Sequence, residues 1–450
     1  MKKKIAEETI ILVSVFKWIV LASLVGIIVG ISTTVFVRSL NWGAAISDGY
    51  RYYYILLPAG LLLSALTVKY LAPAAEGHGA DKVIELIHKT SGKIKAVFVP
   101  VEFITTWLTI SAGGSAGKEG PSAQIGAGLA SIFADLLKME GADRRKLVIC
   151  GISGSFASVF GTPLAGAIFG IEVLFVGTIR YDVLLPSFVA GIISYQVSSW
   201  MGLTYFYHPI SFVPVFSEAF FLKIVVAGIF FGLCSLLLIE ILSLGKKISA
   251  GLGLPVELKS ILGGLALVAM TFIISRQYLG LGIEVLQSAL EGADIPWYAF
   301  IVKSIFTSVT LNFGGSGGMG TPIFYVGSTA GSALSHVLGV DPAMLAAIGF
   351  VSLLAGAANT PIAASIMSVE LFGPQVAPYA AVACVLSFIV TGHRSAYPSQ
   401  VLAVRKSSSL DVEIGDKLES MRPQYRHREK SLIGGLLRIW RKISRDVDNR

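Results

Sequence analysis

The hydrophobic residues of this 450-residue chain gather in long uninterrupted runs, unlike those of a soluble fold. Residues 10–37 contain a single charge, Lys17, and residues 220–242 contain only Lys223 and Glu240. Runs of roughly 20 apolar residues are long enough to cross a bilayer as helices. A membrane β-barrel would instead show short segments of alternating hydrophobicity. The pattern therefore predicts a helical integral membrane protein.

The same pattern predicts the individual helices. Residues 163–177 and 361–372 are too short to span a bilayer, and each begins at a proline. Short or proline-broken helices at matching places in two halves of a chain are typical of transporters that bind substrate near the membrane midplane. The other predicted segments are 9–40, 54–72, 95–112, 121–138, 143–159, 183–201, 217–246, 257–276, 297–312, 322–338, 342–357 and 376–391, with an amphipathic stretch at 80–90.

Composition supports the membrane class and indicates an orientation. Hydrophobic residues make up 54% of the chain and charged residues 14%, whereas about a quarter is usual for the charged residues of soluble domains. The net charge of +8 is concentrated at the two ends, which favours a cytoplasmic location for both termini. Because the basic residues flank membrane segments and form no separate domain, we do not expect nucleic-acid binding.

The last 46 residues differ in composition from the rest of the chain. Residues 1–404 are predicted to form the transmembrane domain, and residues 405–450, with twelve Lys/Arg against seven Asp/Glu, a basic cytoplasmic tail. Within the tail, residues 430–445 place apolar side chains on one helical face and basic side chains on the other. Such a helix either lies on anionic membrane lipid or docks onto the protein's own cytoplasmic face.

Two blocks of the chain resemble each other at a constant offset of 198 residues. Residues 149–173 match residues 347–371 through the pairs Gly151 and Gly349, Ala157 and Ala355, Pro163 and Pro361, and Glu172 and Glu370. Glycine clusters precede both blocks in the same order. The chain is therefore predicted to contain two repeats, at about 54–201 and 257–391. Whether they are inverted depends on an odd number of crossings per repeat.

Each repeat contains a glycine-rich turn that opens a helix with proline, at Gly117–Pro121 and at Gly318–Pro322. A third glycine turn, Gly77–Asp81, precedes the amphipathic stretch. The N-terminus of a helix offers unpaired backbone N–H groups and the positive end of the helix dipole. Glycine lets the backbone approach a ligand, and proline in the first turn loses no needed donor. Such turns at membrane depth predict an anion site.

The sequence GKEGP at residues 117–121 resembles the most characteristic motif of the CLC family of chloride channels and chloride/proton exchangers. The proline-leucine-alanine-glycine segment that ends in a glutamate, at 163–172, also resembles that family, and the likeness runs from about residue 10 to 400. It implies an all-α integral membrane bundle of about 17–18 full and partial helices, built from two inverted repeats. It also implies a multi-pass homodimer in the cell membrane, with a separate pore in each subunit.

The resemblance assigns roles to particular residues. Glu119 matches the gating glutamate, whose carboxylate imitates the permeant anion and moves away when it is protonated; the alternative is a glutamate that merely caps a helix. The predicted anion-binding residues are His78, Gly79, Gly117, Lys118, Gly120, Met319, Gly320, Thr321 and Tyr397. His78 stands where the family has serine, and it either binds the anion or caps its turn. Gly320 replaces an aromatic residue of the family pattern.

The proton route departs from the pattern of the family's exchangers. Val173 occupies the position of their inner, proton-transferring glutamate, and the adjacent residue is Glu172. Either coupling is lost, or Glu172 or His78 relays the proton to Glu119. Glu102 stands where relatives often carry a basic residue. There it either lowers the positive potential that attracts anions or packs within the bundle.

The predicted function is transport of chloride or a similar small monovalent anion, by passive conduction or in exchange for protons, without a cofactor or metal. A membrane enzyme is not expected, because no catalytic or metal-binding motif is present in the sequence. A cation-coupled solute carrier would place acidic residues, rather than glycine-rich helix starts, at its broken helices. Helix dipoles alone do not distinguish chloride from nitrate or fluoride.

Overall fold

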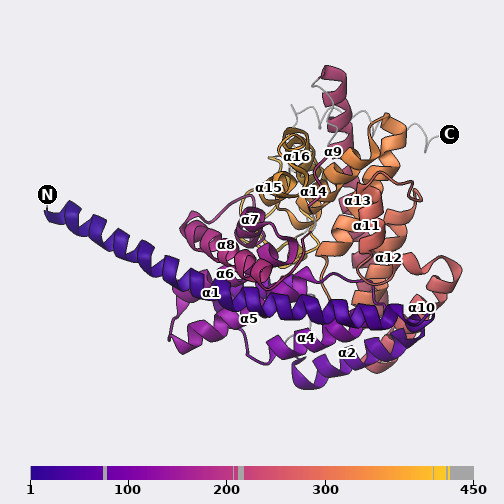
Figure 1. The fold of residues 1–450 in the computed structure, drawn as a ribbon, viewed down its shortest axis with the longest axis horizontal. Helices are drawn as coiled ribbons and strands as arrows, with labels where there is room; N and C mark the ends of the chain where they lie inside the picture. The colour runs from indigo at the N-terminus through magenta and orange to yellow at the C-terminus, as the bar shows by residue number, and fades with distance from the viewer. Residues whose placement is uncertain are drawn as a thin grey trace.

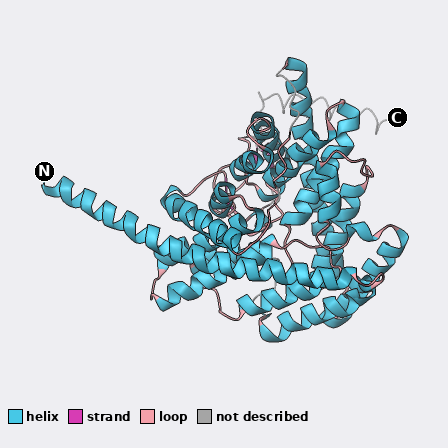
Figure 2. Cartoon of the chain, viewed as in Figure 1, coloured by secondary structure: helices cyan, strands magenta, loops and turns pink. Residues whose placement is uncertain are grey.

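Helices make up most of the structure, a computed structural model that describes residues 2–73, 79–205, 207–210, 217–408, 410–421 and 424–425 (Figure 2). Within the first half, the helices are α1 (Lys2–Asp48), α2 (Leu57–Leu71), α3 (Gly79–Thr90), α4 (Phe98–Ser111), α5 (Glu119–Leu136), α6 (Gly141–Phe160), α7 (Pro163–Glu172) and α8 (Leu184–Trp200). The second half contains α9 (Glu218–Gly251), α10 (Val256–Ile273), α11 (Ile283–Leu290), α12 (Ala299–Asn312), α13 (Gly320–Leu338), α14 (Pro342–Ala358), α15 (Pro361–Phe372) and α16 (Ala377–Thr391).

Most helices predicted from the hydrophobic pattern are confirmed, with three differences. The first helix is longer than 9–40, because charged residues at its start are good helix formers. Helix α7 ends at Glu172 rather than at 177, because strand β1 (Phe175–Val176) pairs in parallel with β2 (Val401–Leu402). Helix α11 was not predicted, since its eight residues carry too short a pattern to separate from a loop.

The long helices present apolar side chains to their surroundings. The first helix, whose N-terminal end stands away from the bundle, exposes Ile10, Leu12 and Phe16 by 68–70% (Figure 1). Five helical segments of the described chain are long and apolar enough to cross a membrane: Glu7–Ser47, Tyr53–Leu71, Tyr181–Trp200, Glu218–Gly251 and Val256–Ile273. A soluble protein rarely exposes so much apolar surface. The structure therefore agrees with the predicted all-α membrane class.

Glycines bring the central helices of each repeat into close contact. A Cβ atom on Gly151 of α6 would lie 2.5 Å from the carbonyl oxygen of Gly126 on α5. The same pairing recurs in the second repeat, where Gly327 of α13 meets Gly349 of α14. Small residues at such contacts let helix backbones pack closely in a membrane. The duplicated glycine pattern of the sequence thus corresponds to two equivalent helix pairs.

Reciprocal hydrogen bonds show that the two repeats are related by an approximate two-fold rotation. Gly117 and Gly318, which precede α5 and α13, form a short antiparallel bridge in which each N–H donates to the other carbonyl at 2.7 Å. A second reciprocal pair, both at 3.0 Å, runs from the N–H of Ser115 to Thr310 Oγ1 and from the N–H of Ser316 to Thr109 Oγ1. An exchange of identical contacts is the property of a two-fold axis.

The contacts between α7 and α15 show that the repeats are inverted. A glutamate at the end of each helix accepts hydrogen bonds from two backbone N–H groups at the start of the other. The donors, at 2.8–3.1 Å, are Ile362 and Ala363 for Glu172, and Leu164 and Ala165 for Glu370. Each short helix thus begins where the other ends, so the two run antiparallel. This answers the question of inversion that the sequence left open.

The beginning of the predicted tail packs against the membrane domain. Beyond β2, Lys417 lies 3.7 Å from Glu85 of α3, and Glu419 of η5 (Leu418–Ser420) forms a 2.9 Å ion pair with Lys246 of α9. Strands β3 (Leu410–Asp411) and β4 (Gln424–Tyr425) pair antiparallel. The predicted amphipathic helix at 430–445 lies outside the described residues.

Candidate anion site

The N-terminal ends of three helices meet where the two repeats join. The Gly117–Gly318 bridge holds the starts of α5 and α13 together. The start of α3 reaches the same place, since a Cβ atom on Gly120 would lie 2.9 Å from the Cα of Gly318 and 3.3 Å from the N of Ala80. Three positive helix ends therefore meet in one small region. This convergence is what the sequence predicted for an anion site.

Glycine is required at this junction for two separate reasons. Gly79, the first residue of α3, has a φ of +44°, in the left-handed region that side chains disfavour. A Cβ atom there would also lie 2.8 Å from the carbonyl carbon of Gly120. Any larger residue at Gly79 or Gly120 would therefore push the helix starts apart.

The Glu119 carboxylate occupies the junction. Thr321, in the first turn of α13, donates its backbone N–H to Glu119 Oε2 at 2.8 Å and its hydroxyl to Oε1. Glu119 is only 3% exposed, although it is the first residue of α5. Its negative charge lies at the positive end of the opposite helix, and it uses donors that a bound anion would also need.

The other predicted anion-site residues of the two loops lie at the same junction. Lys118 and Met319 occupy the equivalent positions before α5 and α13, with φ of −96° in both. Lys118 interacts electrostatically with Glu119, and Met319 is 3% exposed. Gly320, the first residue of α13, leaves room for the Glu119 carboxylate, since a Cβ atom there would lie 2.8 Å from Glu119 Oε2. His78 lies outside the described residues.

Tyr397 lies on the segment that follows α16 and is not part of a helix. It is 4% exposed, its backbone N–H donates to Ser395 Oγ at 2.9 Å, and its hydroxyl group interacts electrostatically with both Glu119 and Asp81. The structure thus brings Tyr397 close to the predicted gate, although 278 residues separate them in the sequence.

Asp81 is a residue whose position the sequence did not indicate. Its carboxylate accepts hydrogen bonds from the backbone N–H of Ser399 at 2.8 Å and from the Ser399 hydroxyl at 3.0 Å. These bonds tie the start of α3 to the segment that carries Tyr397. A sequence signal existed, because an aspartate in the first turn of a helix often accepts backbone donors. The partner, 318 residues away, could not be read from it.

A buried glutamine holds the same segment against both repeats. Gln400 donates from Nε2 to the carbonyl oxygens of Val173 at 2.8 Å and Ala358 at 2.7 Å. Its Oε1 accepts from Asn359 Nδ2 at 3.0 Å and from Ser395 Oγ at 2.6 Å. Every polar atom of the Gln400 side chain is therefore used, which fixes the backbone on which Tyr397 sits.

Neither residue at the expected inner proton position has a free carboxylate. Val173 is fully buried and apolar. Glu172 is 5% exposed, and both of its oxygens accept backbone N–H groups at the start of α15. This geometry is that of a helix cap.

Two buried charges occupy equivalent positions of the two repeats. Glu102 lies in α4, 3.4 Å from Ser316 Oγ and 3.5 Å from Thr106 Oγ1. Lys303 lies in α12 and donates to the carbonyl oxygens of Tyr278 at 3.0 Å and Gly280 at 2.9 Å. Both are packed within the bundle, as one of the two interpretations of Glu102 expected.

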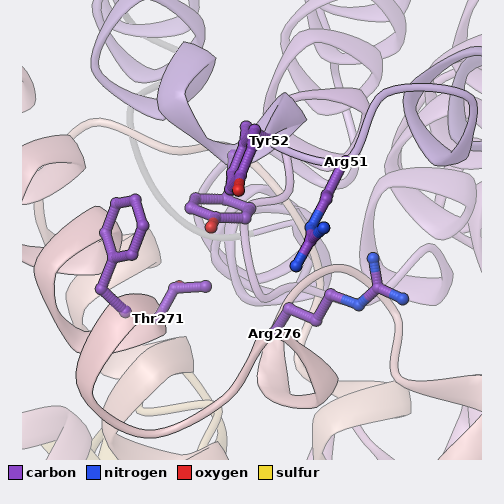
Figure 3. A pocket seen from close by; sticks show the side chains of 6 residues that line it. Arg51, Tyr52, Thr271 and Arg276 are labelled. Carbon is purple, nitrogen blue, oxygen red and sulfur yellow. The ribbon is translucent and has the colours of Figure 1, made fainter.

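A separate pocket of about 630 Å³ lies at one end of the bundle, between η1 (Tyr53–Leu56), the end of α10 and η4 (Arg276–Tyr278). Arg51, Tyr52, Thr271 and Arg276 are among the residues that line it (Figure 3). None of its lining residues belongs to the predicted anion site.

Comparisons with known proteins place this architecture among anion transporters. A family model described as voltage gated chloride channel matches residues 59–392. The chloride/fluoride channel protein of Pseudomonas syringae pv. tomato is 36% identical over 402 residues, which cover 88% of each chain. The H(+)/Cl(-) exchange transporter ClcA of Klebsiella pneumoniae is 23% identical and aligns over 78% of this chain and 80% of its own.

Among solved structures, a CLC-type fluoride/proton antiporter matches with a TM-score of 0.82 and 26% identity, over 86% of this chain and 98% of that one. The helix starts that form the junction, the inverted repeats and the aligned length all agree. The chain therefore belongs to the voltage-gated chloride channel family, the CLC family of anion channels and proton-coupled exchangers.

Proposed function

We propose that this protein exchanges fluoride, in preference to chloride, for protons across the cell membrane, with Glu119 as the gate. The observation that carries the proposal is the pair of donors around the Glu119 carboxylate, the N–H and the hydroxyl of Thr321. A carboxylate oxygen is close in size to fluoride and smaller than chloride. Fluoride is also the halide that most needs strong, short hydrogen bonds to replace its water.

The relatives support the choice of anion and of coupling. The relative that is 36% identical is named for chloride and fluoride, and the solved structure with a TM-score of 0.82 is described as a fluoride/proton antiporter. The more distant ClcA exchanger is named for chloride and protons. The fluoride antiporter and the chloride exchanger are thus both described as exchanging their anion for protons.

The exchange follows from competition for the same donors. When Glu119 is ionised, its carboxylate occupies the Thr321 donors and excludes the anion. Protonation removes the charge that holds the carboxylate there, so the side chain leaves and an anion takes its place. One site thus holds either an anion or an ionised Glu119, and the movement of a proton is linked to the movement of an anion.

A homodimer that packs through α7 and α15 fits the exposed surface. The backbone N–H groups that bind Glu172 and Glu370 include those of Ile362 and Leu164, whose side chains are 47% and 43% exposed. The Glu370 carboxylate is partly exposed and would face lipid unless protein covered it, and placing a charge in lipid is costly. A second copy of the chain would provide that cover.

Both termini are assigned to the cytoplasm from their basic residues.

Flux from liposomes that contain the purified protein tests this function. Vesicles are loaded with potassium fluoride or potassium chloride, the voltage is clamped with a potassium ionophore, and anion and proton movements are measured together. We expect faster efflux of fluoride than of chloride, and uphill proton movement driven by the fluoride gradient. Equal rates for the two anions would refute the selectivity, and anion efflux without proton movement would refute the exchange.

A further inference from the structure

The exchange proposed above needs a group that brings protons to Glu119 from the opposite side of the anion site. The group must have access both to an aqueous surface and to the junction of the helix starts. Val173 cannot carry a proton. Glu172 and Glu370 use both carboxylate oxygens to cap the helices of the opposite repeat, and Glu102 is only 3% exposed. The inference that follows rests on the proposed function and identifies a residue that completes it.

Asp81 meets both requirements. It is partly buried and lies in the first turn of α3, two residues after Gly79, whose backbone contacts that of Gly120. Its carboxylate is hydrogen bonded to Ser399, two residues beyond Tyr397. The Tyr397 hydroxyl interacts electrostatically with both Asp81 and Glu119. Both carboxylates are therefore near enough to Tyr397 to act on its hydroxyl group, and the backbone contact of Gly79 with Gly120 brings the start of α3, which carries Asp81, to the helix that carries Glu119.

Helix α3 carries charged side chains and is not among the apolar helices of the described chain. On the same helix, Glu85 contributes a negative charge next to Asp81. Lys89 and Lys82, at 2.5 Å and 3.0 Å from the Glu85 carboxylate, hold the pKa of Glu85 well below its usual range, at about 2. Glu85 therefore stays ionised and does not compete with Asp81 for a proton.

The tail segment packed against α3 adds two more charged groups. Glu419 contributes a second negative charge next to Asp81, and it forms an exposed ion pair with Lys246. Lys417 lies 3.7 Å from Glu85. The surface beside Asp81 therefore carries paired charges of both signs, which favour contact with water over contact with lipid.

We infer that Asp81 is the inner proton-carrying residue of the exchange. The proton leaves the Asp81 carboxyl group and crosses the anion pathway beside Tyr397 to the Glu119 carboxylate. One O–H bond breaks on Asp81 and one forms on Glu119, so Asp81 is left ionised. It regains a proton from the aqueous surface formed by α3 and the tail.

The test compares Asp81→Asn with Ser399→Ala, using the number of protons moved per fluoride ion as the readout. Asp81→Asn keeps an oxygen that can accept from Ser399 but cannot carry a proton as a carboxylate does. Ser399→Ala removes one hydrogen bond from the same contact and leaves the carboxylate in place. We expect Asp81→Asn to lower the ratio by at least about tenfold, a smaller factor than the about 10²–10⁴-fold that a positioned proton-transfer group contributes to a rate. Ser399→Ala should keep the wild-type ratio, and Asp81→Glu should restore much of it.

The outcomes separate this inference from the proposed function. If the wild type moves fluoride without protons, the proposed exchange fails and the role of Asp81 fails with it. If the wild type is coupled and Asp81→Asn keeps the same ratio, only the role of Asp81 is refuted. A ratio lost equally in Asp81→Asn and Ser399→Ala would show that the contact merely positions Tyr397. Should Asp81→Asn fail to elute as a folded protein, Asp81→Glu decides: a retained proton ratio with a shifted pH profile supports the proton carrier, and a retained ratio with the wild-type pH profile refutes it.

Discussion

Replacing Glu172 with glutamine distinguishes a helix cap from a proton carrier. In the structure, Glu172 Oε1 accepts the N–H of Ile362 at 3.1 Å, and Oε2 accepts that of Ala363 at 2.8 Å. Glutamine is nearly the same size, but it keeps only one acceptor oxygen. Its NH₂ group would face a backbone N–H, and two donors cannot bond to each other.

The expected loss of stability can be worked out from these contacts. A hydrogen bond to a charged group contributes about 1.5–3 kcal/mol, and the N–H group left without a partner is buried. The start of α15 also loses the favourable interaction of its dipole with a negative charge, about 0.3–1 kcal/mol or more. We therefore expect Glu172→Gln to lower the free energy of unfolding by about 2–4 kcal/mol. Glu370→Gln should cost less, because Glu370 is more exposed.

Thermal unfolding in detergent, followed with fluoride and proton flux from liposomes, measures both properties. Glu240→Gln is the matched control, because Glu240 forms an ion pair with Arg394 whose two side chains are each 57% exposed. Such pairs contribute little to stability, so the control should unfold like the wild type. An unchanged unfolding midpoint in Glu172→Gln, together with loss of proton movement, would refute the cap and make Glu172 the proton carrier.

Three further predictions concern the anion site and the packing of the repeats. Glu119→Gln should make anion flux independent of pH, because no ionised carboxylate competes for the Thr321 donors. Flux is measured from acidic to alkaline pH, and a pH profile like that of the wild type would contradict the prediction. Thr321→Val should weaken fluoride binding by about tenfold, the value of one hydrogen bond, and chloride binding by less. Isothermal titration, or flux measured against anion concentration, gives both affinities. Equal losses of fluoride and chloride affinity would contradict the prediction. Gly151→Ala should destabilise the protein by about 1–3 kcal/mol through its contact with Gly126. Gly251→Ala is the control and should not destabilise it, because nothing lies within 4 Å of a Cβ atom at that position. Identical melting curves for the two variants would argue against the close helix packing.

The local features of this protein could be predicted from its sequence because each depends on neighbouring residues. Long apolar runs have few alternatives to membrane helices. Proline is favoured in the first turn of a helix, so the two glycine-proline turns predicted the starts of α5 and α13 within about two residues of Glu119 and Gly320. The 198-residue repeat was also visible, because duplicated helices keep the same small residues at their contacts.

The tertiary structure alone decided which distant groups meet. The bond from Ser399 to Asp81, the caps on α7 and α15, and the position of Tyr397 beside Glu119 all join segments that are far apart in the chain. Short polar side chains such as Asp81 have many possible partners, and the sequence around them carries no record of the one selected. That partner is determined when the two repeats pack about their shared axis, because burial then leaves each polar group only the donors that the opposite repeat presents.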